Sequence, residues 1–357
     1  MFNSKIYFPN LNGLRFIAAL SVIIYHVYGL ETLNGHLGVI LFFVLSGFLI
    51  TTLLLEEKEV TENINIKFFW IRRCLRIWPL YFFIVFITFI AIYTGFAGGT
   101  LSQYKGSFWY YLVFIPNVAF IINAGLPYAS VLWSVGSEEQ FYLVWPFLVK
   151  YSGKYFWMTL IIVLVGFTIA PILLDYYNFH HYQSKNEVIG FISHLMMRMA
   201  FNCMATGALT AYIWRKRPDL FKYIFSKIFQ IGLVIVTLVL WIKNYHKAGS
   251  DEVFAILFAL VIANAALNPG NIIRLENRVF KHLGKISYGL YVYHLIVLAI
   301  VTYIAVEITG GPLNQHLLFV VGTLATIGVS TLSYNYFEKF FLKIKDLRFT
   351  VIKSGSL

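Results

Sequence analysis

The sequence predicts an all-α fold: a polytopic transmembrane bundle of about ten spanning helices plus one re-entrant or broken segment. Three observations support this prediction. Of the 357 residues, 59% are hydrophobic and only 12% are charged, whereas a soluble domain carries about a quarter charged residues. The apolar residues come in runs of about 20, the length that a helix needs to cross the hydrocarbon layer. Continuous apolar runs also exclude a transmembrane barrel, which needs short alternating strands.

Ten apolar segments of spanning length follow one another along the chain. They cover residues 13–30, 37–55, 77–97, 133–149, 156–174, 191–214, 228–243, 251–267, 286–307 and 316–335. A further apolar segment, residues 108–122, is interrupted by Pro116 and Asn117, so we predict that it is the broken or re-entrant helix, on the outer side. Because no extended soluble domain or repeat is visible, we expect one transmembrane domain over residues 1–345 and a short cytoplasmic tail at 346–357.

The basic residues predict the orientation. With ten spans and both termini in the cytoplasm, all but five of the 28 Lys and Arg residues fall at inner ends, as the positive-inside rule requires. The exceptions are Lys105, Lys185, Lys243, Lys247 and Arg198. An eleventh span would place the later basic clusters outside, so we expect a multi-pass protein of the cytoplasmic (inner) membrane. The position of these residues at helix ends also argues against a nucleic-acid binder, despite the net charge of +12.

The cysteines and the paired histidines do not predict a metal site or a disulfide. Cys74 and Cys203 are far apart and lie within or beside apolar segments. His180 and His181 are adjacent, which is not a metal-ligand spacing. We therefore expect no bound metal.

Ionisable side chains are costly inside a membrane helix, so each one in a predicted span is a candidate site residue. In the first span, Arg15 and His26 are eleven residues apart. This is about three turns, so both lie on one face, with Arg15 near the cytoplasmic mouth and His26 in the outer half. The alternative roles are a snorkelling anchor for Arg15 and a helix-packing hydrogen bond for His26.

The run from Phe68 to Pro79 is basic and amphipathic and contains Arg72, Arg73 and Arg76. Arg73 and Arg76 share a helix face at positions i and i+3. Paired guanidiniums suit phosphate oxygens, which they can hold by bidentate bonds. A positive-inside anchor with interfacial tryptophans explains the same residues, and spacing alone favours that alternative.

The segment that opens the fourth span places Ser134, Glu138 and Tyr142 on one helix face, at i, i+4 and i+8. A carboxylate at this depth could orient or charge-balance a histidine. Alternatively, Glu138 and its neighbour Glu139 simply favour the N-terminus of the helix.

Two later spans contain further candidates. In the sixth span, His194 lies one turn before Arg198, and the two could hold a sugar or an acidic head group. A structural ion pair of Arg198 with Asp175 or Glu187 is an equal alternative. His294, in the ninth span, is better explained as a packing residue.

At these residues the sequence resembles the acyltransferase-3 family, membrane-bound O-acyltransferases that modify surface carbohydrates and some lipids and macrolides. The matching motifs extend over nearly the whole chain, and their order and spacing together are specific. They are residues 11–15 with Tyr25 and His26, 38–50, 72–79 with Tyr81, 133–138 with Tyr142, 283–288 with His294, and 337–338.

The resemblance implies an acyl-CoA donor, usually acetyl-CoA, that enters from the cytoplasm, and an acceptor hydroxyl on the outer side. It implies His26 at the reacting centre and Arg15 beside the donor path. The other residues that it implies fall into three groups. Arg73 and Arg76, with Arg72 beside them, would hold the donor's phosphates; Glu138 would assist catalysis, supported by Trp133, Ser134, Tyr142 and Asn12; Arg198 and His194 would lie on the acceptor side.

Two departures limit the resemblance. The family's common Asp residues are replaced here by Asn12 and Ile40, so the roles of those acids are not carried over to this chain. Many relatives have an appended extracytoplasmic esterase-like domain. This chain resembles the stand-alone transmembrane form, and a second transfer step would then need another protein.

Residues and resemblance together predict a transmembrane O-acyltransferase that moves an acyl group, with acetyl expected, from cytoplasmic acyl-CoA to a hydroxyl of a surface or lipid-linked carbohydrate. His26 would take the hydroxyl proton, with or without a covalent acyl-enzyme. The expected partners are acyl-CoA, the glycan acceptor and membrane lipid, with no permanently bound cofactor and no nucleic acid. The alternatives are a transporter or flippase of a lipid-linked sugar and a scaffold for a polysaccharide synthase.

Overall fold

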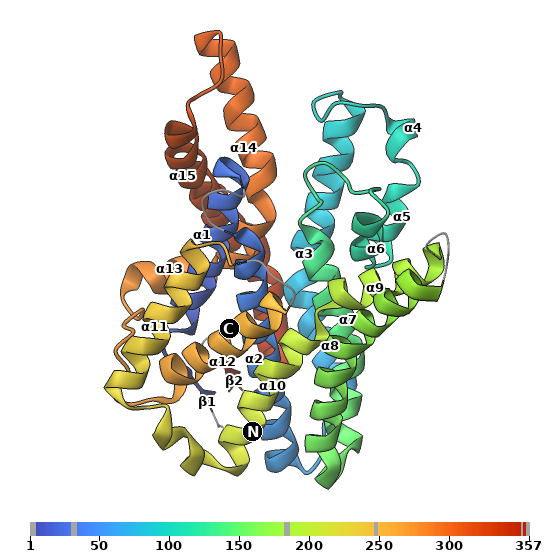
Figure 1. Cartoon of the computed structure of the whole chain (residues 1–357). Helices are drawn as coiled ribbons and strands as arrows, with labels where there is room; N and C mark the ends of the chain where they lie inside the picture. Colours follow the sequence, from blue (N-terminus) through green and yellow to red (C-terminus); the bar gives the residue numbers. More distant parts are fainter. Residues whose placement is uncertain (1–4, 30–33, 182–185, 246–248, 351–352, 355–357) are drawn as a thin grey trace. The chain divides into compact units, whose positions relative to one another are not determined.

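The computed structural model describes residues 5–29, 34–181, 186–245, 249–350 and 353–354 and is almost entirely helical in these ranges (Figure 1). The chain folds as two compact units. Unit 1 comprises Met1–Leu45 and Ile213–Leu357, and unit 2 comprises Ser46–Tyr212. The boundaries fall inside two helices, α2 (Gly35–Thr61) and α10 (Phe201–Lys216), so each of these contributes to both units.

Unit 1 contains the first part of α2, the end of α10 and the following elements. They are β1 (Lys5–Ile6), α1 (Leu11–Tyr28), the 3-10 helix η2 (Pro218–Tyr223), α11 (Lys227–Ile242), α12 (Ser250–Leu267), α13 (Arg278–Lys285), α14 (Ser287–Thr309), α15 (Gln315–Ser333), the π-helical turn η3 (Tyr334–Glu338), α16 (Lys339–Arg348) and β2 (Lys353–Ser354). The two short strands pair in parallel, which brings the N-terminal and C-terminal segments together.

Unit 2 contains the remainder of α2 and α10 and the elements between them. They are α3 (Ile66–Tyr93), α4 (Leu101–Tyr104), α5 (Ser107–Leu112), α6 (Pro116–Ile121), α7 (Leu132–Tyr151), the 3-10 helix η1 (Gly153–Tyr155), α8 (Phe156–His181) and α9 (Glu187–Met199).

Helix α1 is the centre of unit 1, where it packs against α12, α13, α14 and α15. Small residues allow this close packing, as is usual between membrane helices. A Cβ atom on Gly284 of α13 would lie 2.2 Å from the carbonyl oxygen of Asn12, so only glycine fits there. Ala19 of α1 is fully buried in the same core, beside Ile286 and Leu290.

The start of α1 is fixed by a polar cluster outside the spanning segment. Asn10 adopts a left-handed conformation with φ 63°, and its side-chain oxygen accepts a hydrogen bond of 2.7 Å from the backbone N–H of Leu275. Glu276 accepts hydrogen bonds from the Tyr7 hydroxyl and from the Asn10 N–H, and it pairs with Lys281 at 2.9 Å. Partial burial works to raise the pKa of Glu276, but these bonds outweigh it and hold the pKa below its usual value.

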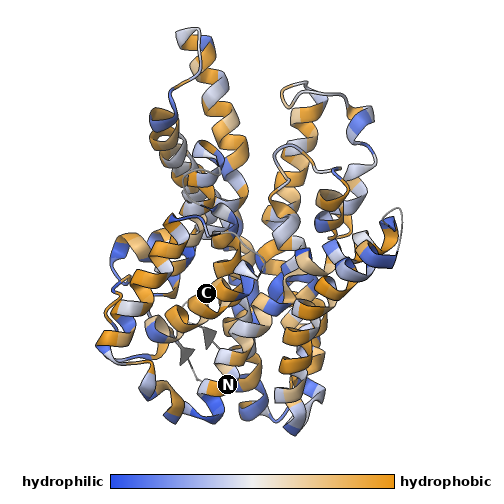
Figure 2. Ribbon diagram, viewed as in Figure 1, coloured by the Kyte–Doolittle hydropathy of each residue, from blue (hydrophilic) through white to orange (hydrophobic). Residues whose placement is uncertain are grey.

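The prediction of an all-α transmembrane fold is confirmed. Nine of the ten predicted spans fall on a single helix, but the sixth, residues 191–214, is divided between α9 and α10, which are separated by Ala200 with φ 50°. Among the described residues, eight helices are long and apolar enough to cross a membrane. The count of ten is not confirmed, because α7 is not among the eight and α11, with 16 residues, is shorter than they are. Figure 2 shows the long helices as largely hydrophobic, with hydrophilic residues gathered at turns and ends.

The lipid-facing character of these helices is clearest in α8. Large apolar side chains on it are exposed, such as Ile162 at 67% and Leu173 at 59%. So much exposed apolar surface marks contact with an apolar environment. Together with the long apolar helices, it identifies the chain as a membrane protein.

One predicted boundary is corrected. The third span was predicted at residues 77–97, but α3 begins at Ile66. The side chain of Asn65 caps the helix by accepting a hydrogen bond of 3.0 Å from the N–H of Phe68. The basic run is therefore part of the helix, and Pro79 lies inside it. Because the first turns of α3 contain charged residues, their hydropathy is low, and the hydropathy pattern did not indicate that the helix begins there.

The interrupted segment is broken, as predicted. Helices α5 and α6 are separated by residues 113–115, where Phe114 has φ 59°, and Pro116 is the first residue of α6. The fully buried Asn117 exchanges two hydrogen bonds with Gln140 of α7, of 3.0 and 2.9 Å. The break therefore allows a polar side chain to fix α6 against α7.

Some predictions stay untested. The boundary of the single predicted domain, at residue 345, falls inside α16. Leu30, Lys185, Lys247 and residues 351–352 and 355–357 of the predicted tail lie outside the described residues.

Candidate functional site

His26 lies in the last turn of α1 and is exposed. Its Nδ1 is 2.8 Å from the backbone carbonyl oxygen of Val22, one turn earlier. Because a carbonyl oxygen only accepts hydrogen bonds, Nδ1 carries the proton, and Nε2 of the neutral ring keeps its lone pair. No described residue forms a hydrogen bond to Nε2. His26 therefore presents an available base.

A second histidine, His294 of α14, contacts His26. Its Nε2 is 3.2 Å from His26 Nδ1, and the two ring centroids are 4.8 Å apart. His294 is fully buried, and its own Nδ1 is 2.6 Å from the carbonyl oxygen of Tyr291. The sequence predicted a packing residue, and its contact with the candidate base was missed. The two histidines are 268 positions apart, and no local pattern reports such a contact.

Arg15 lies in the interior of unit 1, with 9% of its surface exposed. Ala19 and Val22, between Arg15 and His26 on α1, are buried at 0% and 3%. Asn12 is also buried and contributes its carbonyl to the packing against Gly284. On the helix face that Arg15 and His26 were predicted to share, Arg15 is thus buried, whereas His26 is exposed.

In unit 2, Glu138 of α7 is at the centre of a hydrogen-bonded cluster. One carboxylate oxygen accepts a bond of 2.9 Å from the Ser46 hydroxyl of α2, and the other accepts a bond of 2.9 Å from the Tyr142 hydroxyl. The predicted shared face of Glu138 and Tyr142 is therefore present. Ser134 donates to the carbonyl of Val131 at 3.3 Å. Ser46 was not predicted, although it lies within one of the motifs that carry the resemblance.

The basic run places its arginines in different surroundings. Arg72 forms a 2.8 Å ion pair with Glu57 of α2. Arg73 is 8% exposed, and its guanidinium lies 5.6 Å from the Phe69 ring centroid and 5.7 Å from that of Tyr142. Its Nε is buried, with no hydrogen-bond partner among the described residues. Arg76, one turn later, is partly buried.

Glu139 is a further acid beside this cluster that sequence reasoning treated only as a helix-start charge. One of its oxygens accepts a 2.8 Å bond from the indole N–H of Trp78. The other is buried and has no partner among the described residues. Arg73 thus keeps an unpartnered buried donor and Glu139 an unpartnered buried acceptor, and buried polar groups of this kind ordinarily have a hydrogen-bond partner.

Arg198 and His194, the two residues predicted on the acceptor side, lie in different surroundings. The guanidinium of Arg198 lies 4.7 Å from the Phe120 ring centroid and 5.1 Å from that of Trp133. The predicted supporting residue Trp133 thus packs on Arg198. His194 is exposed on α9, one turn before Arg198. The ion pairs considered for Arg198 stay predictions.

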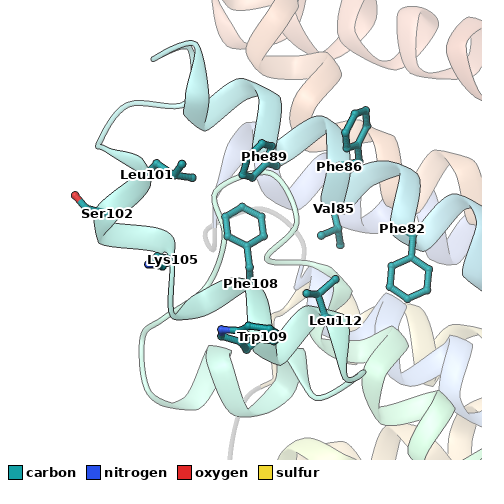
Figure 3. A pocket seen from close by; sticks show the side chains of 10 residues that line it. All are labelled: Phe82, Val85, Phe86, Phe89, Leu101, Ser102, Lys105, Phe108, Trp109 and Leu112. Atoms are coloured by element: carbon teal, nitrogen blue, oxygen red, sulfur yellow. The ribbon is translucent and has the colours of Figure 1, made fainter.

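An apolar groove of about 650 Å³ lies between α3, α4 and α5 of unit 2 (Figure 3). Aromatic and aliphatic side chains form most of its wall, and Ser102 and Lys105 are its polar members. The remaining lining residues are Phe82, Val85, Phe86, Phe89, Leu101, Phe108, Trp109 and Leu112. Within the described ranges, no group of three or more His, Cys, Asp or Glu side chains could hold a metal ion.

Comparison with known proteins identifies the family. Residues 8–335 match the acyltransferase domain family, Acyl_transf_3. The chain belongs to this family. It is 28% identical, over 94% of its length, to a protein of Staphylococcus aureus (strain COL) named "Putative O-acetyltransferase SACOL0978". It is also 28% identical, over 93% of its length, to the O-acetyltransferase OatA of Staphylococcus aureus (strain NCTC 8325 / PS 47).

The chain spans less than three fifths of the length of these relatives, since the matches cover 58% and 57% of them. No solved structure matches it significantly. Membership in the acyltransferase family makes the histidine geometry relevant to chemistry, because an acyltransferase that acts on a hydroxyl needs a base that removes the hydroxyl proton. His26 is an exposed residue whose Nε2 keeps its lone pair.

Proposed function

We propose that this chain is a transmembrane O-acyltransferase that moves an acetyl group from cytoplasmic acetyl-CoA to a hydroxyl of a surface or lipid-linked carbohydrate on the outer side. The observation that carries the proposal is the hydrogen bond between Nδ1 of His26, an exposed residue, and the Val22 carbonyl, which leaves the lone pair on Nε2. The O-acetyltransferase names of the relatives support acetyl as the transferred group. The excess of basic residues at the expected inner ends supports the orientation, and the β1–β2 pairing supports termini on one side.

His26 acts as the general base in this proposal. Its Nε2 takes the proton of the acceptor hydroxyl while the hydroxyl oxygen attacks the thioester carbonyl carbon. The carbon–sulfur bond then breaks, and the coenzyme A thiolate leaves and takes the proton from Nε2. The ester is formed and the imidazole is neutral again. A positioned base of this kind contributes a factor of about 10²–10⁴ to the rate.

The donor's phosphates and amides fit the polar groups around Arg73. A buried guanidinium without a carboxylate bond is costly in a membrane helix, so it gains from a bound anion. The unpartnered Nε of Arg73 can donate to a phosphate or carbonyl oxygen, and the unpartnered oxygen of Glu139 can accept from an N–H. Arg76 adds a second positive charge on the same helix. Arg72 is already paired with Glu57 and serves the fold of this region.

The groove supports a lipid-linked acceptor. Its wall consists of hydrocarbon and aromatic side chains, which suit a lipid chain. Lys105, on the lining, provides a positive charge for a phosphate that joins a lipid to a sugar. The expected partners are therefore acetyl-CoA, the lipid-linked or surface glycan and membrane lipid.

Proteoliposomes test this function. The purified chain is reconstituted with labelled acetyl-CoA outside and a candidate glycan acceptor sealed inside, and alkali-labile label on the acceptor is measured. We expect transfer by the wild type and by His282→Ala, which changes an exposed histidine hydrogen-bonded to Thr331. We expect His26→Ala to lower the rate by a factor of about 10²–10⁴. Transfer by His26→Ala at the wild-type rate would remove His26 from the mechanism.

A further inference from the structure

His294 is a buried polar side chain for which the proposed reaction has no direct task. It is fully buried on α14, so it cannot touch the acceptor or the thioester. Yet its Nε2 lies 3.2 Å from His26 Nδ1. A polar group within a membrane bundle is retained only where its hydrogen bonds are satisfied or where it has a function. The contact with His26 therefore requires an explanation.

The surrounding carbonyl groups determine where the ring protons lie. The carbonyl oxygen of Tyr291 is 2.6 Å from His294 Nδ1, and that of Val22 is 2.8 Å from His26 Nδ1. Both carbonyls can only accept, so both Nδ1 atoms carry protons, and both Nε2 atoms of the neutral rings carry lone pairs. His294 Nε2 is then an acceptor that faces the Nδ1–H of His26. A doubly protonated His294 would place two N–H groups against each other, so His294 stays neutral.

We propose that His294 is a positioning residue for His26, an inference that rests on the proposed function. Its Nε2 shares the Nδ1–H of His26 with the Val22 carbonyl, which fixes the tautomer and the orientation of the His26 ring. The lone pair of His26 Nε2 is thereby held at the opposite side of the ring from His294, where the acceptor hydroxyl can reach it. The same logic orients the base in other nucleophile–base pairs, in which a third group holds the imidazole.

The contact also assists the reaction step itself. When the hydroxyl proton moves to His26 Nε2, the ring becomes positively charged, and its Nδ1–H becomes a stronger donor. His294 Nε2 accepts from that N–H without taking the proton. The proton leaves again from His26 Nε2 to the coenzyme A thiolate, so His294 has the same protonation before and after each cycle.

The packing of α1 against α14 holds the two histidine rings in contact. Helices α1 and α14 are in direct contact, and the two rings are tilted by 56°. Small residues along both helices, such as Ala19 and Gly289, are buried, which permits close approach. His294 is therefore held by the fold, and His26 takes its orientation from it.

Nitrogen-15 NMR of the full chain in lipid nanodiscs tests the tautomer without any activity. Histidine is labelled with ¹⁵N, and the His26 and His294 signals are assigned from the spectra of His26→Gln and His294→Gln. At neutral pH we expect a protonated Nδ1 and an unprotonated Nε2 for both residues. A His26 ring protonated on Nε2, or a His294 ring protonated on both nitrogens, would overturn the proposal.

Kinetics of two substitutions test the role. His294→Leu removes the acceptor, and His294→Gln keeps a carbonyl oxygen that can accept from His26. We expect His294→Leu to lower kcat by about 10- to 100-fold, the loss that one hydrogen bond to the charged ring accounts for, with little change in the KM for acetyl-CoA, and His294→Gln to recover most of that loss. His282→Leu, a change of an exposed histidine in unit 1, should keep the wild-type kcat.

The outcomes separate this inference from the proposed function. A His294→Leu variant with the wild-type kcat, or a His294→Gln variant that loses as much as His294→Leu, contradicts the positioning role. An inactive wild type, or a His26→Ala variant that transfers at the wild-type rate, contradicts the proposed function instead.

Discussion

Two neighbouring arginines of α3, Arg72 and Arg73, offer a quantitative test of the donor site, because the same substitution should have different effects at each. The side chain of Arg72 is 12% exposed and pairs with Glu57, whose side chain is 3% exposed. Breaking a buried ion pair by removing one partner costs about 3–5 kcal/mol, because the other charge stays buried. Arg72→Gln should therefore lower the melting temperature strongly.

Arg73→Gln should instead leave the melting temperature unchanged or raise it. This guanidinium is buried over two aromatic rings and has an unpartnered Nε. The ring contacts contribute about 0.5–2 kcal/mol, which the desolvation of a buried cation offsets. A hydrogen bond to a charged phosphate contributes about 1.5–3 kcal/mol, so donor affinity should fall about 10- to 150-fold.

The assay combines thermal unfolding in detergent with calorimetric titration of acetyl-CoA. We expect Arg72→Gln to be unstable but, at a temperature where it is folded, to bind acetyl-CoA nearly as the wild type does. Arg73→Gln should be stable and bind weakly. Wild-type affinity in Arg73→Gln would show that Arg73 does not hold the donor.

Three further predictions concern the packing, the pH dependence and the groove. Gly284→Ala places a Cβ 2.2 Å from the Asn12 carbonyl oxygen and should lower the free energy of unfolding by about 1–3 kcal/mol, measured by thermal unfolding. The control Gly311→Ala, whose Cβ meets nothing within 4 Å, should leave it unchanged. Equal melting temperatures for the two variants would contradict the packing of α13 on α1. Hydrogen bonds hold the pKa of Glu276 below its usual value, so its contribution to stability is complete above the unfolded pKa of about 4.3 and disappears as the pH falls through the folded pKa. Glu276→Gln should remove this acid dependence from the melting temperature, and an unaltered profile would count against the cluster. Val85→Trp should fill part of the groove and reduce transfer to a lipid-linked acceptor without weakening acetyl-CoA binding; undiminished transfer would exclude the groove as the lipid site.

Local sequence patterns were sufficient to locate most of the long apolar helices. Long apolar runs predict membrane helices because the bilayer requires every backbone group to be bonded within the segment. Pro116 predicted the break between α5 and α6 for a related reason, since proline ends or interrupts a helix. The face shared by Glu138 and Tyr142 also followed from helix geometry, because it depends only on residues one turn apart.

Contacts between distant segments could not be predicted in this way. The pairing of Arg72 with Glu57 removes one arginine from the predicted donor site, yet it depends on how α2 and α3 pack within unit 2. The contact of His294 with His26 depends likewise on the packing of α1 and α14. Helical periodicity reports which face a residue occupies, and it contains no information about which helix that face meets.

The start of α3 shows a second limit of sequence patterns. Hydropathy located the apolar part of the helix, but the helix begins eleven residues earlier than predicted, at Ile66. The capping residue Asn65 was a visible signal, because Asn is one of the preferred N-cap residues.

The most direct test is a structure of the chain with a non-reactive thioether analogue of acetyl-CoA and an acceptor sugar. If His26 is the base, the acceptor hydroxyl oxygen should lie about 2.6–3.2 Å from His26 Nε2, with the carbon that replaces the thioester carbonyl about 3–3.5 Å beyond it. A complex in which the sugar hydroxyl and the acyl carbon meet at another side chain, with His26 Nε2 facing neither, would contradict the mechanism.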